Sequence, residues 1–152
     1  MNQTNPQNYL KLSNGQKTPI RNKTAYISGP ITGIVDLNRP AFEHLESILT
    51  GKGYKVVNPH KLHDPNKIET WDHYMRVDVE ALLKCGFCVM LPGWQNSTGA
   101  IFEYITAETL NIPVIDIDFT PLITKKHELY PLFDKLVIKM LETSNIQYLS
   151  LE

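Results

Sequence analysis

The sequence lacks any long hydrophobic run. Among its 152 residues, no apolar segment approaches the ~20 residues that a membrane-spanning helix needs. The opening segment, MNQTNPQNY, also lacks the apolar centre of a signal peptide. We therefore expect a cytoplasmic protein that has no membrane partner.

The sequence also lacks an excess of charge of either sign. Its 15 Lys and Arg residues are balanced by 16 Asp and Glu residues, so the formal net charge is −1. This balance gives no reason to expect nucleic acid as a partner. The hydrophobic content of 42% is ordinary for a globular protein, and the length suits one domain with a single core.

Cysteine is scarce, and the 2 cysteines form the motif CGFC, Cys85 to Cys88. Redox C-x-x-C motifs open a helix, whose N-terminus lowers the thiol pKa, whereas here a helix is predicted to end and a strand to begin. This order favours buried structural cysteines over redox chemistry. His60, His63 and His73 lack the fixed spacing of a helical metal motif, so we expect them to line or cover a cleft. We predict no metal and no cofactor.

What the sequence does contain is a regular alternation of short apolar runs and amphipathic segments. The apolar runs predict strands over residues 24–28, 54–58, 87–91 and 113–117. The amphipathic segments predict helices over residues 39–51, 70–84, 99–110 and 128–142. Continuous apolar strands that alternate with helices are typical of a parallel sheet covered on both faces. The predicted fold class is therefore α/β: a single-domain, doubly wound, mainly parallel sheet of the flavodoxin or Rossmann-like type.

The chain divides into three predicted segments. Residues 1–22 are polar with little periodicity, and we expect a flexible or loosely docked arm there. Residues 23–120 hold the α/β domain, and residues 121–152 are expected to form a helical extension that packs on it. Ligands of such sheets bind beyond the carboxyl ends of the strands, so the loops after the first three strands are the candidate site.

One acidic residue lies on the apolar side of its predicted helix. Projected at 100° per residue, Asp78 falls in the middle of the apolar arc of the helix at 70–84, one turn from Tyr74 and Leu82. An unpaired carboxylate there is costly unless it is hydrogen-bonded or its pKa shifts. Two interpretations stay open: Asp78 caps the amides of a neighbouring loop, or it points into a cleft at the edge of the sheet.

A second acidic residue raises the same question. In the segment NSTGAIFE, Ser97 or Thr98 is a natural N-cap, and Gly99 lets a ligand approach the backbone closely. Exposed amides at such a helix start favour an anion, usually a phosphate. Glu103 follows on a face of small residues. Either it is a nucleophile or base beside a substrate, or it satisfies the helix dipole from the surface.

The loop after the first strand is rich in glycine. In YISGPITG, residues Gly29, Thr32 and Gly33 are placed where amides and a hydroxyl can cradle a phosphate or a sugar. The segment contains neither the Walker A pattern nor the G-x-G-x-x-G fingerprint of dinucleotide-binding loops. By itself, this loop does not identify a ligand.

Together, three segments resemble a known superfamily. YISGPITG after the first strand, YMRVDVEALLKCGFCVMLPGW in mid-chain and STGAIFE at a helix start are similar to the nucleoside 2-deoxyribosyltransferase superfamily, and most similar to its small branch labelled DUF4406. The resemblance covers residues 24–116. It is specific in its order: an aromatic-plus-glycine loop, an aspartate on a helix, then G-A-x-x-E.

The resemblance implies roles for individual residues. Glu103 matches the nucleophile that attacks the anomeric carbon, Asp78 the aspartate that positions the sugar or assists the base, and Tyr26 the tyrosine that orients the nucleophile. Ser97 matches a serine with which nucleotide N-hydrolases contact the 5′-phosphate, at a position where deoxyribosyltransferases tend to have aspartate. Trp94 either stacks on the base or packs the loop in which it lies.

The function that the resemblance implies is cleavage of the N-glycosidic bond of a (deoxy)nucleoside 5′-monophosphate, by hydrolysis or by deoxyribosyl transfer. The expected partner is a small nucleoside or nucleotide. A homo-oligomer is also expected, because superfamily sites are often completed by a neighbouring subunit. The chain departs from the hydrolases in its first loop, where they usually carry an arginine and this chain has none before Arg39. The alternative function is a module that binds a nucleotide without turnover.

Overall fold

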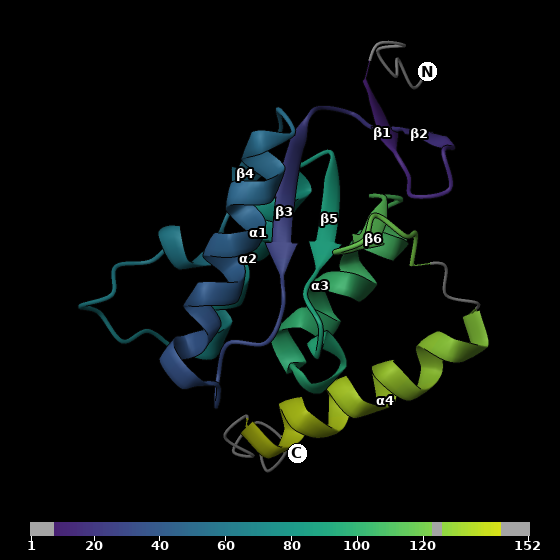
Figure 1. The fold of residues 1–152 in the computed structure, drawn as a ribbon. Helices are drawn as coiled ribbons and strands as arrows, with labels where there is room; N and C mark the ends of the chain where they lie inside the picture. The colour runs from purple at the N-terminus through teal and green to yellow at the C-terminus, as the bar shows by residue number, and fades with distance from the viewer. Residues whose placement is uncertain (1–7, 123–125, 144–152) are drawn as a thin grey trace.

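A parallel sheet with strand order β4-β3-β5-β6 forms the centre of the molecule (Figure 1). The computed structural model describes residues 8–122 and 126–143. The strands of the sheet are β3 (Thr24–Ser28), β4 (Lys55–Val57), β5 (Phe87–Met90) and β6 (Val114–Asp116). The helices are α1 (Arg39–Gly51), α2 (Trp71–Leu83), α3 (Thr98–Thr109) and α4 (Lys126–Thr143). The predicted α/β fold with a mainly parallel sheet is confirmed.

Different helices cover the two faces of the sheet. The chain moves from β3 outward to β4, then returns past β3 to β5 and continues to β6. Because parallel crossovers are right-handed, a reversal of direction places the connecting helices on opposite faces. α1 accordingly packs on the face that carries Ala25 and Ile27, and α2 and α3 pack on the face that carries Tyr26.

Local sequence signals explain where the helices begin. Pro40 lies in the first turn of α1, where its missing N–H leaves no hydrogen bond unmade. The Thr70 hydroxyl caps α2 by accepting a hydrogen bond from the His73 amide. Ser97 caps α3 in the same way, and its hydroxyl accepts from the Ala100 amide at 3.2 Å. These caps place the helix starts within a residue of the predicted positions.

The N-terminal region differs from the expected arm. β1 (Tyr9–Lys11) and β2 (Lys17–Pro19) pair as an antiparallel hairpin. Leu10, Leu12 and Ile20 are buried in the same apolar cluster as α1, so the hairpin is anchored to the core through these three side chains. Strands of three residues are too short to show a periodicity in the sequence. Residues 1–7 of the expected arm lie outside the described residues.

The helical extension is present as α4, which packs against α3. Leu136 is buried between the two helices, and the Lys135 ammonium donates a hydrogen bond to the Gln95 carbonyl at 2.7 Å. Residues 144–152 of the expected extension lie outside the described residues. Within the described part of the chain, no helix combines the length and the apolar character needed to span a membrane.

Candidate active site

The candidate site lies at the point where the strand order of the sheet reverses direction. β3 is followed by a connection to one side and β5 by a connection to the other, so the loops at their carboxyl ends diverge. Open α/β sheets bind ligands at such a switch point. Tyr26 and Ser28 of β3 lie there, paired with Cys88 and Met90 of β5. The helix that follows β5 is α3, which carries Glu103.

Glu103 is buried and held by two hydroxyl groups. Its side chain points from α3 toward β3 and is only 5% exposed. The Tyr26 hydroxyl donates a hydrogen bond to Oε2, and the Ser28 hydroxyl donates one to Oε1 at 2.8 Å. Because successive residues of a strand face opposite ways, Tyr26 and Ser28 reach the same carboxylate from one side of β3. The interpretation of Glu103 as a surface residue is therefore wrong.

The environment of Glu103 favours its protonated form. Burial raises the pKa of its carboxyl group from 4.5 to about 8, and the charge of Asp78 adds to the increase. The hydrogen bonds from Tyr26 and Ser28 oppose the shift because they stabilise the carboxylate. The pKa of Tyr26 is also raised, by burial and then by the charges of Glu103 and Asp78. Tyr26 therefore stays a neutral hydrogen-bond donor at physiological pH.

Asp78 lies on the inner side of α2 and is paired with a histidine. Its side chain is buried, and its Oδ1 lies 2.6 Å from Nε2 of His63, which belongs to the loop after β4. Burial raises the pKa of Asp78, whereas the hydrogen bond and charge of His63 lower it. Since the charge of Asp78 acts on both Glu103 and Tyr26, the two carboxyl groups share one electrostatic environment.

Residues 23–116 match the protein family described as a domain of unknown function (DUF4406). This match covers more than half of the 152 residues. The chain belongs to this family. A search of the curated proteins found no match, and a search of the solved structures found none either. The matched segment of the DUF4406 domain includes β3, α2 and α3, and therefore every residue of the site described above.

Three glycines of the DUF4406 domain were expected to bind a ligand. Gly29 and Gly99 have packing roles, and Gly33 does not. A Cβ on Gly29 would lie 2.7 Å from Cβ of Leu91, so glycine lets β3 and β5 approach at their ends. A Cβ on Gly99 would lie 3.2 Å from the sulfur of Met75, so glycine lets α3 pack on α2. Gly33 has a φ of 81° with open space around it, and it lies beside the exposed Thr32. Of the predicted loop, Thr32 and Gly33 remain accessible to a ligand.

The Trp94 side chain is packed inside the DUF4406 domain. Its ring lies 4.5 Å from the ring of Tyr104, centroid to centroid, and the side chain is 8% exposed. The structure thus favours the packing interpretation of this residue over base stacking. Ser97 is half-buried, and its hydroxyl already accepts the capping hydrogen bond of α3.

The cysteines of the CGFC motif are free and buried. Burial raises the pKa of Cys85 to about 11 and the pKa of Cys88 well above its usual value. Both groups are therefore thiols rather than thiolates, and the structural interpretation holds. In the described ranges, no group of three or more His, Cys, Asp or Glu side chains is arranged to hold a metal ion.

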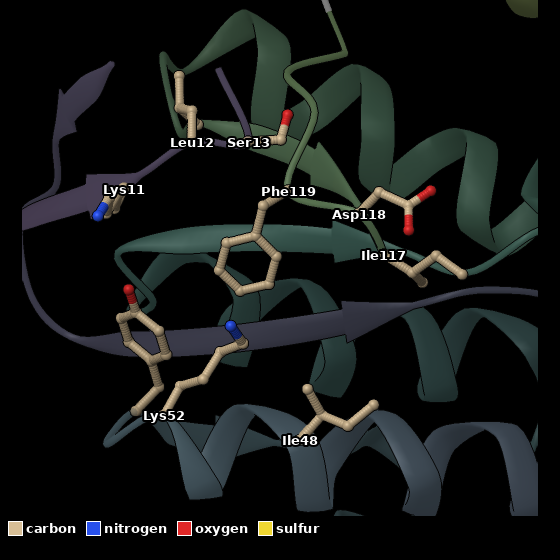
Figure 2. A pocket seen from close by; sticks show the side chains of 9 residues that line it. Lys11, Leu12, Ser13, Ile48, Lys52, Ile117, Asp118 and Phe119 are labelled. Carbon is tan, nitrogen blue, oxygen red and sulfur yellow. The ribbon is translucent and has the colours of Figure 1, made fainter. Parts of the chain in front are cut away.

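A hollow of about 560 Å³ lies on the other side of the sheet, between the end of α1, the hairpin and the turn after β6 (Figure 2). Phe119 projects into it, and the Lys52 ammonium lies 5.0 Å from the centre of the Phe119 ring. Ile48, Tyr54 and Phe119 belong to the α1 side of the molecule. This hollow is therefore separate from the buried carboxyl groups on the α3 side.

Two residues of the site, Ser28 and His63, have partners that the sequence did not predict. Ser28 follows Tyr26 by two positions on β3, so strand alternation was sufficient to place it beside the same partner. His63 was expected only to line or cover the cleft, because a histidine in a loop has no periodicity that assigns it a partner. Its contact with Asp78 depends on how the loop after β4 folds back over α2.

Proposed function

We propose that this DUF4406 domain cleaves the N-glycosidic bond of a (deoxy)nucleoside 5′-monophosphate, by hydrolysis or by deoxyribosyl transfer, as the resemblance to the nucleoside 2-deoxyribosyltransferase superfamily implies. The observation that carries the proposal is the buried Glu103 carboxyl group, held by Tyr26 and Ser28 and coupled electrostatically to the buried Asp78. Most enzymes that hydrolyse glycosidic bonds use a pair of carboxyl groups as their catalytic residues.

In the first step the ionised form of Glu103, which is the minor form below its pKa of about 8, acts as the nucleophile. Its carboxylate oxygen forms a bond to C1′ of the sugar while the bond from C1′ to the base nitrogen breaks. The electron pair of that bond leaves with the base, which takes a proton from Asp78. The raised pKa of Asp78 supports this role, because a carboxyl group must be protonated to act as an acid.

In the second step water cleaves the ester between Glu103 and the sugar. The water oxygen bonds to C1′, its proton passes to Asp78, and Glu103 returns to a carboxylate. If a second base takes the place of water, the same intermediate gives deoxyribosyl transfer. The hydrogen bonds from Tyr26 and Ser28 favour ionised Glu103 at both ends of this cycle.

The test is to incubate the protein with ribo- and deoxynucleosides and with their 5′-monophosphates, and to measure released base by chromatography. We expect release by the wild type and a loss of about 10³-fold or more in Glu103→Gln. Glu108→Gln, on the same helix, is the matched control and should retain activity. Exchange of base in the presence of a free acceptor base would identify a transferase.

Two outcomes would contradict the proposal. Equal rates in the wild type and Glu103→Gln would remove Glu103 from the chemistry. Tight binding of a nucleotide without base release would instead favour the alternative, a nucleotide-binding module without turnover.

A further inference from the structure

His63 is held firmly against Asp78 by its surroundings. The side chain of His63 is 17% exposed and that of Asp78 is 11% exposed, so water competes little for their hydrogen bond. The His63 ring packs edge-on against Tyr74, with centroids 4.8 Å apart and an interplanar angle of 85°. The Tyr74 hydroxyl in turn accepts a hydrogen bond from the Glu69 amide at 3.0 Å and therefore ties the loop to α2.

The pKa of Asp78 is subject to two opposing effects, burial and its contact with His63. His63 faces it from the loop after β4, while Glu103 from α3 and Tyr26 from β3 share its electrostatic environment. His73 lies 6.5 Å from His63, centroid to centroid, on the exposed side of α2. Burial favours the neutral acid, whereas the hydrogen bond and charge of His63 favour the carboxylate. His63 is the one described group that hydrogen-bonds to the Asp78 carboxyl group.

We propose that His63 is a positioning residue that controls the proton of Asp78 during glycosidic cleavage. This inference rests on the proposed function. When the base departs it takes the proton of Asp78, and the new carboxylate is stabilised by the hydrogen bond that His63 Nε2–H donates. When water attacks the ester, its proton returns to Asp78, so the cycle has no net proton change. His63 thereby makes Asp78 a stronger acid without contacting the substrate.

The inference predicts that His63→Leu lowers kcat about tenfold or more with a smaller change in KM, because it removes a hydrogen bond to a charged group. The alkaline limb of the pH profile should move to higher pH, since His63 lowers the pKa of Asp78. His63→Gln keeps an N–H donor and should recover part of the loss in kcat. His73→Gln is the matched control, and neither its kcat nor its pH profile should change.

A second measurement does not depend on activity. The Asp78 carboxyl group, labelled with ¹³C, is titrated by NMR in the wild type and in His63→Leu. We expect its midpoint to lie at higher pH in the variant. An unchanged midpoint, or a His63→Leu enzyme with an unmoved pH profile, would show that His63 only fastens the loop and would overturn the inference.

The two measurements separate this inference from the proposed function. If the wild type releases no base from any nucleoside or monophosphate, the proposed function fails, and the NMR titration still decides whether His63 controls the Asp78 proton. If the wild type is active but His63→Leu matches it in kcat and pH profile, the inference alone fails.

Discussion

The two faces of β3 show how one strand serves two purposes. Ala25 and Ile27 face α1 and are buried among apolar side chains. Tyr26 and Ser28 face α3, and both donate hydrogen bonds to the buried carboxyl group of Glu103. Both pairs of residues are equally inaccessible to water, but only one pair surrounds an ionisable group.

The two faces of β3 contribute differently to the protein: one stabilises the fold, and the other holds the ionisable groups of the candidate site. The α1 side removes apolar surface from water, which is the main favourable contribution to folding. The α3 side buries two carboxyl groups, and at neutral pH this opposes folding because these groups are ionised and well hydrated in the unfolded chain. The same burial is what gives Glu103 a pKa of about 8. Substitutions on the two sides should therefore have different consequences.

The largest expected effect on stability lies on the apolar side. Leu49 of α1 is fully buried, and Leu49→Ala should lower the free energy of unfolding by about 2–5 kcal/mol, because it leaves a cavity. Urea denaturation measures this change. Base release per folded molecule should stay the same, and a parallel loss of activity would mean that the two faces are not independent.

The next effect concerns the pH dependence of stability. Glu103 has a pKa raised from 4.5 to about 8, so the folded state binds more protons than the unfolded state between these values. The contribution of protonated Glu103 to the free energy of unfolding is fully present below about pH 4.5. It falls by about 1.4 kcal/mol per pH unit as the pH rises to about 8.

Glu103→Gln removes this titration while keeping the shape of the side chain. Urea denaturation at several pH values should show a flatter profile for Glu103→Gln than for the wild type over this range. Glu108→Gln is again the control on the same helix. Identical pH profiles for the wild type and Glu103→Gln would show that Glu103 ionises normally in the folded protein.

A smaller effect is expected for the hydroxyl that holds Glu103. Tyr26→Phe removes one hydrogen bond to a charged group, worth about 1.5–3 kcal/mol, so kcat should fall about 10- to 100-fold. The pKa of Glu103 should rise further, which moves the acid limb of the activity profile to higher pH. Tyr54→Phe, on the α1 side, should leave the profile unchanged. Equal effects of the two substitutions would contradict the distinction between the faces.

The smallest effect is expected at the start of α3. Ser97→Ala removes the N-cap and should lower stability by about 1 kcal/mol, and Thr70→Ala, which removes the cap of α2, is the matched control. If Ser97 also contacts a 5′-phosphate, KM should rise for monophosphates but not for nucleosides. A rise for both substrate types would limit Ser97 to its capping role.

Much of the fold was predictable because its signals are local. The strand at 24–28 and the helix at 39–51 have the bounds predicted from apolar runs, proline and glycine. The hairpin at 9–20 was not predictable in this way, because each of its strands spans three residues and its burial depends on the α1 side of the sheet.

The candidate site was predictable in part. Helical projection identified Asp78 as a carboxyl group on an apolar face, and the small residues around Glu103 marked it as a second such group. The resemblance added Tyr26 and the roles of all three residues. Ser28 and His63 were missed as partners of these groups, although the structure places each within 2.8 Å of its carboxyl group. For Trp94 the sequence left base stacking and loop packing open, and the structure favours packing, because its ring lies against Tyr104.

The sequence by itself determined the alternation of strands and helices and the presence of two acidic residues on apolar faces, because both depend on spacing along a single element. Only the tertiary structure decided what holds those acidic residues. Glu103 is bound by residues 77 and 75 positions earlier in the chain, and His63 reaches Asp78 from a loop without periodicity. Such contacts follow from the order of the strands and the path of the loops, which no local pattern encodes.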